Sequence, residues 1–415
     1  LSEVVVIGYG TQKKKEVTGA VSVVNAEVIE KLNPVRIEQA LQGQVSGVNI
    51  NSTSGSPGSG LNIRIRGIST NGDNRPLILV DGNPITDLSV INPNDIKSVN
   101  VLKDATAGIY GVRAANGVII IETKTGTKAT PIRFTVDSNY AFQETTKKMD
   151  LLSPIDYAKY VNQALDNNGS NPRFTLYPET GTDWQEAVFE TAPMYNFNLS
   201  ANGGTEKLTY AFSTSYLNQE GIVGGDKSAY KRITASTNLQ YELIKDLKLS
   251  FSVIGTLSDK NILQEGNVGS VLFNGFNMDP TQLIYDKNII GGFTQADNLT
   301  NEIINPIAQM ANTFDTSQTK KISPNFGIDY SFFNNFKISS KFRMNYAEVD
   351  GRKLTPSFFY GGSKNFNADT STYTENNDKY IDYTVDNFIT YDKTFNNNHN
   401  LKLLLGYSLY KNTGE

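Results

Sequence analysis

The sequence predicts an all-β membrane barrel, of which this chain contains about nine strands, preceded by a compact unit of mixed α/β structure. From about residue 131 onward, apolar and polar residues alternate over stretches of about ten residues, which is the length that a tilted membrane strand needs. Strands of soluble sheets usually have only about five or six residues. Long and short connections also alternate along this part of the chain, as they do in outer-membrane barrels.

Composition argues against several functional classes. The 415 residues include 38 Lys and Arg against 42 Asp and Glu, a formal charge of −4, so no general attraction to nucleic acid is expected. Cysteine is absent and His399 is the only histidine, which argues against disulfides, His or Cys metal sites and a Ser-His-Asp triad. We therefore expect no metal, no cofactor and no catalytic residue. No run of about 18 apolar residues predicts a membrane helix.

We expect three segments: an N-terminal segment over residues 1–14, the mixed unit over 15–128 and the barrel strands over 129–415. Because the chain begins at Leu1 rather than Met, we also expect a processed product. In the mixed unit, Asn33 followed by Pro34 predicts a helix start. Ile37 and Leu41 would share one face of that helix, and Gly43 would end it.

The rest of the mixed unit reads as short strands and turns. Ile63 and Ile65 alternate with arginines, which predicts a strand with one buried face. Residues 77–80 form an apolar run before Asp81-Gly82, a sequence typical of a tight turn. Asn92-Pro93 repeats the cap-and-proline signal, and residues 118–121 form a β-branched strand that closes the unit.

Nine strands follow in the second unit, with aromatic residues gathered near many strand ends, as in the interfacial girdles of membrane barrels. Pro324 lacks a backbone N–H, so it predicts a bulge or a strand end. The predicted strands are residues 132–142, 195–201, 208–213, 232–241, 247–253, 322–332, 336–346, 381–391 and 401–409.

The connections support a barrel over a soluble sandwich. They are in turn long (143–193), short, medium (218–229), short, long (258–319), short, long (349–379) and short. Nine is an odd number, whereas single-chain bacterial barrels have even counts. An open sheet would also leave unpaired backbone groups in hydrocarbon, so we expect the chain to form part of a larger barrel.

The long connections hold the candidate ligand-contacting residues. Aromatic rings among Asn, Asp and Gly side chains suit carbohydrate rings or extended peptides, although such rings could equally pack the loops together. The candidates are Trp184, Phe273, Phe276, Tyr285 and Tyr360.

Two carboxylate pairs, Asp382 with Asp386 and Asp183 with Glu186, raise the alternative of glycoside hydrolysis. They lie in alternating strands or polar loops, where nothing indicates the desolvation that such chemistry needs, so we do not predict an enzyme.

The first residues form a short β-prone segment followed by a basic stretch. Such a segment could add as an edge strand to the sheet of a partner. On composition alone, a first strand of the folded unit is the more economical interpretation. The segment consists of Glu3, Val4, Val5, Val6, Ile7, Gly8, Tyr9 and Gly10.

Seven motifs, in order along the chain, resemble the plug domain of SusC/RagA-type TonB-dependent transporters. They are LQGQVSGV (41–48), SGSPG (54–58), IRIRG (63–67), PLILVDG (76–82), INPNDI (91–96), VLKDA (101–105) and YGVRAANGV (110–118). The residues that carry this plug signature are Gly43, Gly47, Arg64, Arg66, Gly67, Asp81, Gly82, Lys103, Asp104, Tyr110, Gly111, Arg113, Asn116 and Gly117.

The resemblance implies a 22-stranded outer-membrane barrel whose lumen holds the N-terminal unit as a plug. It also identifies residues 3–10 as the segment that binds TonB, which is driven by the inner-membrane ExbB-ExbD motor. Further implied partners are a SusD-like lipoprotein, outer-membrane lipid and a glycan or peptide ligand, but no nucleic acid. The implied function is active import of a large nutrient, and the alternative is a structural or adhesive β-protein.

Overall fold

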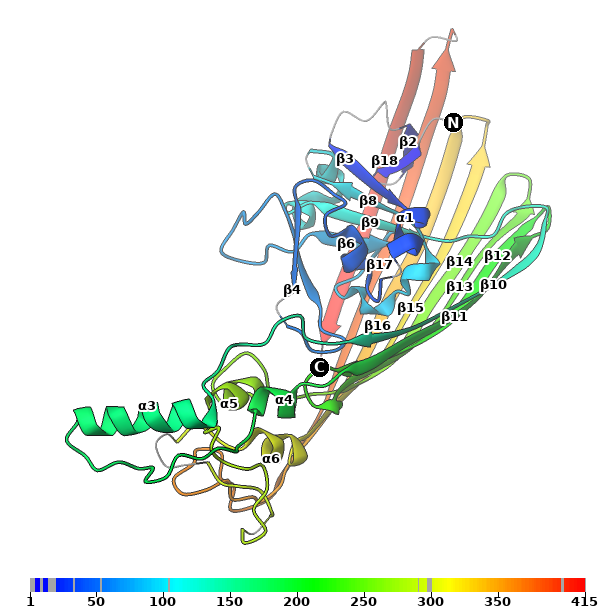
Figure 1. Cartoon of the computed structure of the whole chain (residues 1–415). Helices are drawn as coiled ribbons and strands as arrows, with labels where there is room; N and C mark the ends of the chain where they lie inside the picture. The colour runs from blue at the N-terminus through cyan, green and yellow to red at the C-terminus, as the bar shows by residue number, and fades with distance from the viewer. Residues whose placement is uncertain are drawn as a thin grey trace.

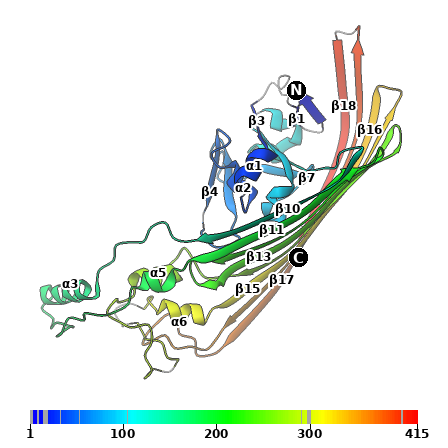
Figure 2. The same ribbon diagram turned by 45° about the vertical axis from the view of Figure 1, so that its right-hand side comes forward.

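The structure, a computed structural model, consists of a small mixed α/β unit that lies against one face of a large twisted antiparallel sheet (Figures 1 and 2). We call the small unit (residues 20–128) the head and the nine-stranded sheet the wall. The structure describes residues 4–7, 10–13, 20–32, 34–52, 54–103, 105–289, 291–296, 301–396 and 399–414.

The head is built on a five-stranded sheet in the order β3-β8-β9-β6-β7, in which β6 and β9 are parallel. A separate hairpin pairs β4 with β5. In chain order the elements are β3 (Val21–Asn25), α1 (Ala26–Leu32), α2 (Ile37–Leu41), β4 (Val48–Ser52), β5 (Leu61–Ile65), β6 (Leu77–Val80), β7 (Asn83–Pro84), η2 (Leu88–Val90), η3 (Pro93–Asp95), β8 (Ile96–Leu102), η4 (Ala105–Ala114) and β9 (Val118–Thr123).

Most predictions for the head are confirmed. Residues 77–80 form β6, and Asp81 and Gly82 take positive φ in the turn to β7. Asn92 accepts a hydrogen bond from the Asn94 amide at the start of η3. The predicted helix start at 33–34 is wrong, because α2 begins at Ile37, where the Gln39 side chain accepts from the preceding amides. Helix α1 was not predicted, and Asn33 lies outside the described residues.

One apolar core holds the head together. Ile29, Leu41, Val99 and Ile119 are fully buried in it, and of the wall it includes only Ile254. Burial of side chains of this size stabilises a fold by about 1.5–3 kcal/mol each. The head therefore has a hydrophobic core of its own.

The wall confirms all nine predicted strands, each extended at one or both ends. Every strand pairs antiparallel with the next one in sequence. The strands are β10 (Thr130–Gln143), β11 (Ala192–Gly204), β12 (Leu208–Gly221), β13 (Gly225–Ile244), β14 (Leu247–Asn261), β15 (Phe314–Phe332), β16 (Phe336–Thr355), β17 (Thr372–Phe395) and β18 (His399–Gly414). Among the described residues, no helix is long and apolar enough to cross a membrane.

Two details of the wall differ from the predictions. Strand β15 runs through Pro324 without a bulge, because the pairs Ile322–Tyr346 and Asn325–Arg343 keep one register with β16. The expected medium connection at 218–229 is instead a tight turn, since β12 and β13 extend until only residues 222–224 separate them.

The long connections lie at one end of the wall and fold together there (Figure 1). They contain α3 (Pro154–Asn167), α4 (Trp184–Val188), α5 (Val271–Asn277) and α6 (Pro306–Ala311). The N-terminus lies toward the opposite end, where the short turns are. There β1 (Val4–Ile7) pairs antiparallel with β2 (Gly10–Lys13). The two ends of the wall thus carry different structures.

Candidate functional site

The head meets the wall through hydrogen bonds rather than through a shared apolar core. Asn345 on β16 donates to the carbonyl oxygen of Pro84 at 2.9 Å and to Asp382 of β17 at 2.8 Å. Asn83 donates to the Asn345 side-chain oxygen, also at 2.8 Å. Such contacts can be exchanged for water at a small net free energy of about 1 kcal/mol each, so they suit an interface that opens.

A second contact is ionic. Lys321 on β15 lies 2.6 Å from the Asp87 carboxylate of the head. Burial opposes the charge on Asp87, but Lys321 and the hydrogen bonds from Ser89 outweigh it and hold the pKa of Asp87 well below its usual range. Asp87 is therefore ionised at neutral pH. Nearby, the Arg36 guanidinium lies 2.7 Å from Glu38 and 3.5 Å from Asp87.

A third contact centres on Asp95, which accepts hydrogen bonds from Ser213 at 2.6 Å and Ser236 at 3.1 Å on two wall strands. Burial raises the pKa of Asp95, although the two hydroxyl groups favour its charged form. Close by, Asn92 donates to Asn198 at 2.6 Å. Polar side chains thus join the head to β11, β12 and β13 as well as to β15 and β16.

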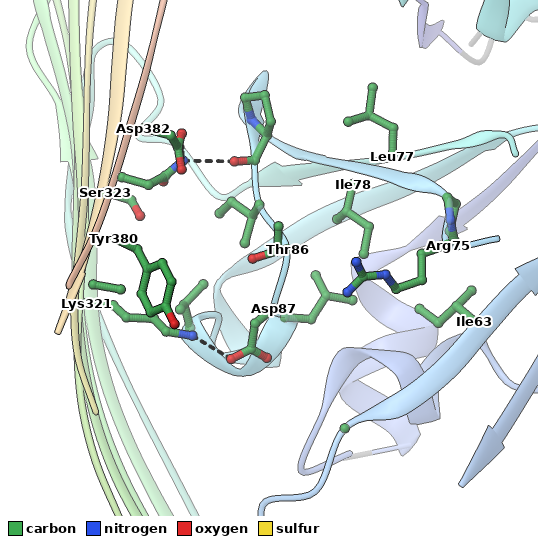
Figure 3. Close-up of a pocket in the computed structure, with 18 of the residues that line it drawn as sticks. Ile63, Arg75, Leu77, Ile78, Thr86, Asp87, Lys321, Ser323, Tyr380 and Asp382 are labelled. Carbon is green, nitrogen blue, oxygen red and sulfur yellow. Dashed lines mark hydrogen bonds and ion pairs between the residues drawn. The ribbon is translucent and has the colours of Figure 1, made fainter. Parts of the chain in front are cut away.

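Between head and wall lies a cavity of about 780 Å³ (Figure 3). Its head side carries both charge and apolar surface, from residues such as Arg75, Leu77 and Ile78, while the wall contributes polar side chains from β15 to β18. Figure 3 shows the Asp87–Lys321 pair at one edge of this space and Asp382 with Ser323 further along the wall. The cavity could accommodate a polar chain with some apolar groups.

The structure assigns backbone roles to the glycines of the plug signature. Gly43, Gly47, Gly67, Gly111 and Gly117 all have positive φ, a conformation that glycine adopts without strain. At Gly82, with φ +81°, an added Cβ would lie 2.8 Å from the Arg343 guanidinium of the wall, which forms a buried ion pair with Asp386. Gly82 is therefore a point of close approach between head and wall.

The charged and polar residues of the signature mostly form hydrogen bonds that stabilise turns within the head. Asp81 accepts from the Thr123 amide and hydroxyl, and Lys103 donates to Ser46 and Ser22. Asn116 donates to the Asp73 carbonyl. Arg64 and Arg66 are exposed beside the β4–β5 hairpin, Tyr110 packs on a small core, and Asp104 lies outside the described residues.

Arg113 is the signature residue that reaches the wall and the cavity. Its guanidinium lies 4.6 Å from the ring centroid of Tyr410 on β18.

Among the candidate ligand-contacting residues, Trp184 is a correction. It is only 2% exposed, and its indole N–H donates to the Asp279 carbonyl at 3.0 Å, so it packs the loops together instead of facing a ligand. Phe273 and Phe276 lie half-buried on α5. Tyr285 is exposed, and its ring lies tilted at 37° to that of Phe293 with the centroids 5.3 Å apart. Burial raises the pKa of Tyr360 to about 12.

The N-terminal segment is only partly described. Val4–Ile7 form β1, while Glu3, Gly8 and Tyr9 lie outside the described residues, and Gly10 begins β2. Each member of the two carboxylate pairs has a structural partner: Asp382 binds Asn345, Asp386 binds Arg343, Asp183 caps α4 and Glu186 binds Lys148.

Sequence reasoning did not identify the wall side of the interface. Asn345 and Asp382 alternate with apolar residues and look like ordinary inward-facing positions of a strand, and Lys321 lies just before the predicted strand 322–332. Only the register of the strands and the docking of the head bring them to Asp87 and Pro84.

Comparison with known proteins agrees with these features. Residues 13–118 match the TonB-dependent Receptor Plug Domain family. The chain is 36% identical over 99% of its length to TonB-dependent receptor P26 of Formosa agariphila, and 32% identical over 91% to TonB-dependent receptor SusC of Bacteroides thetaiotaomicron. It spans 41% and 40% of these relatives, respectively.

The fold is also similar to a solved structure of the RagAB peptide importer in its open-open state. The TM-score is 0.84 at 24% identity, over 99% of this chain and 49% of that chain.

Proposed function

The chain belongs to the SusC/RagA-type TonB-dependent receptors, of which it comprises a plug and nine barrel strands, and from this premise we propose that the whole protein imports a large nutrient across the bacterial outer membrane. The observation that carries the proposal is that hydrogen bonds and ion pairs between polar side chains join the head to the wall. A head held by hydrogen bonds and ion pairs would close the lumen, and its displacement would remove only Ile254 from its apolar core.

In this proposal the wall spans the outer membrane, with the long loops outside and the short turns in the periplasm. The N-terminal residues then lie on the periplasmic side, where TonB would pair with the segment 3–10 by strand addition. Energy would come from the ExbB-ExbD motor through TonB, so the protein itself needs no nucleotide. Ligand binding must favour release of this segment, because a ligand shifts only an equilibrium whose two states it binds differently.

We further propose that a SusD-like lipoprotein covers the folded loops and that the cargo is a glycan or an oligopeptide. The cavity between head and wall, with its mixture of polar and apolar groups, suits either class. The RagAB structure to which the fold is similar is described as a peptide importer. The long loops are rich in neutral polar residues, which slightly favours a glycan over a charged peptide as the cargo.

Deletion of residues 2–9 from the full-length protein tests the proposal. Growth on a panel of glycans and of oligopeptides as sole carbon source should first identify the imported compound. The deletion should then abolish its uptake but leave its binding to the purified protein unchanged. The structural or adhesive alternative predicts no effect on uptake, and that outcome would overturn the proposal.

A further inference from the structure

A second, smaller cavity of about 140 Å³ lies between the head and strands β13 to β15. Its wall side is a patch of neighbouring positions on one face of the sheet, because Arg232 pairs with Ser258, and Ser258 with Thr319. Lys260 lies two residues beyond Ser258 and shares that face. The head covers this patch. The residues that line the cavity are Gly58, Asp87, Ser89, Tyr230, Thr256, Ser258, Lys260, Ser317, Thr319 and Lys321.

Positive charge exceeds negative charge around this cavity. Arg36 is paired with Glu38, and Lys321 is paired with Asp87. Arg232 does not line the cavity itself but lies next to Ser258, which does, and it is 2% exposed. Among the described residues no carboxylate forms an ion pair with Arg232, although Asp87 and Glu38 favour its charge from further away. Its guanidinium donates to the Ser89 carbonyl at 3.0 Å, and its Nε has no hydrogen-bond partner. A buried charge without a counter-ion costs several kcal/mol.

Lys260 is the second cation without a paired carboxylate in the described part of the chain. Its ammonium group donates to Ser59 at 3.2 Å, and Glu265, which also acts on it, is exposed in the following loop. Lys260 and Arg232 occupy diagonal positions on adjacent strands, and such positions lie about 7–8 Å apart. Two cations at this separation, with hydroxyl groups between them, can share the oxygens of one anion.

We propose that this cavity is an oxyanion-binding site for a carboxylate, sulfate or phosphate group. Lys260 in the cavity and Arg232 beside it supply the charge, and Ser258 and Thr319 supply hydroxyl donors. Since a water molecule occupies about 30 Å³, the space corresponds to about four or five waters and admits one such group.

The site also adjoins the larger cavity, because Asp87 and Lys321 line both. An acidic group of a cargo molecule lying in the larger cavity can therefore reach it. The same chemistry fits a free inorganic anion. The site goes beyond the proposed function and does not depend on it, since ion binding is measurable without transport.

Calorimetric titration of sodium sulfate into the full-length protein in detergent, in chloride buffer of matched ionic strength, tests the proposal. Sulfate should bind, and Lys260→Met should weaken its binding at least tenfold. Lys248→Met, at the exposed far end of β14, is the matched control and should leave the affinity unchanged. Thr319→Val keeps the shape of the side chain and removes one hydroxyl group, so it should weaken sulfate binding several-fold. This variant tests the site if Lys260→Met fails to fold.

Titration of a galacturonic acid trimer distinguishes the source of the anion. Displacement of sulfate by the trimer, but not by its neutral methyl ester, identifies an acidic group of a larger ligand as an occupant. Sulfate binding without such displacement identifies a free anion. Sulfate affinity that is absent in the wild type, or equal in Lys260→Met and Lys248→Met, overturns the site whatever the outcome of the uptake experiment.

Discussion

Asp87 combines three roles in one side chain. It begins the turn η2 by accepting from the Ser89 amide, it pairs with Lys321 of the wall, and it borders both cavities. The pair with Lys321 requires the ionised carboxylate. Loss of the charge on Asp87 should therefore weaken the attachment of the head to the wall.

Asp87→Asn should lower stability at pH 7 and have less effect in acid. Because the folded protein holds the pKa of Asp87 below its unfolded value, the stabilisation is present above about pH 3.9 and is lost as pH falls through the folded-state pKa. The side chain is 41% exposed, so solvent screens the pair and we expect a loss on the order of 1 kcal/mol. Thermal midpoints of both proteins at pH 7 and pH 3 measure it.

Asp73→Asn is the matched control. Hydrogen bonds from Arg75 lower the pKa of Asp73 to about 2, but this pair lies exposed within the head and does not reach the wall. Its substitution should change the midpoint little. Equal effects of the two substitutions at pH 7 would show that the contact with Lys321 does not secure the head.

At the scale of elements, the folded loops depend on a few buried amide side chains. Asn305 is 1% exposed, accepts from the Ile307 and Ala308 amides at the start of α6, and donates to the carbonyls of Ile284 and Thr294. It thus joins two stretches of the same connection. The loops keep a defined shape because such bonds cannot be replaced by water inside the packed unit.

Asn305→Ala should unfold the connection 262–313 locally while the wall stays intact. It removes a helix cap worth about 1 kcal/mol and leaves the Thr294 carbonyl without its donor, at about 1–3 kcal/mol. The Ile284 carbonyl keeps its hydrogen bond from the Thr294 amide. Limited proteolysis with fragment mapping should show new cleavage within 262–313. Asn288→Ala, an exposed residue of the same connection that bonds only locally to Asp286, should leave the pattern unchanged. Identical patterns would contradict the assigned role of Asn305.

The strands could be predicted from sequence, but their ends could not. Apolar and polar residues alternate only in the part of a strand where one face is apolar in its environment and the other is polar. In β16 this part is Phe336 to Tyr346, which is shorter than the whole strand. Beyond that part both faces meet water, and residues such as Lys320 and Asp350 pair across strands without any apolar pattern. Trp184 was misassigned for a related reason, because a ring in a polar loop looks the same whether it is covered or exposed.

At the scale of the whole molecule, the head–wall contacts join residues hundreds of positions apart, such as Asn83 and Asn345. No local pattern encodes such pairs, so sequence indicated the head, the wall and the family but not the interface between them. Both cavities are products of that docking. Gly43 and Gly82 could be predicted because helix ends and tight turns depend only on neighbouring residues, whereas the other glycines of the signature were identified only through the family resemblance.

Locking the head to the wall should stop transport and preserve ligand binding. The described chain has no cysteine, so Asn83→Cys combined with Asn345→Cys allows a short bifunctional thiol reagent to join the two sides. Uptake of the imported compound should fall to background after cross-linking, since TonB could no longer displace the head. Each single variant treated with the same reagent should still import. Full uptake by the cross-linked protein would mean that cargo passes without movement at β7.

The almost separate core of the head bears on how such a molecule is made. Apart from Ile254, the residues that fill this core all come from the head itself, and a unit with its own core can fold as a unit. If the strands insert into the outer membrane as proposed, the head can therefore fold in water before or during that insertion, and it would then dock on the wall mainly through polar side chains.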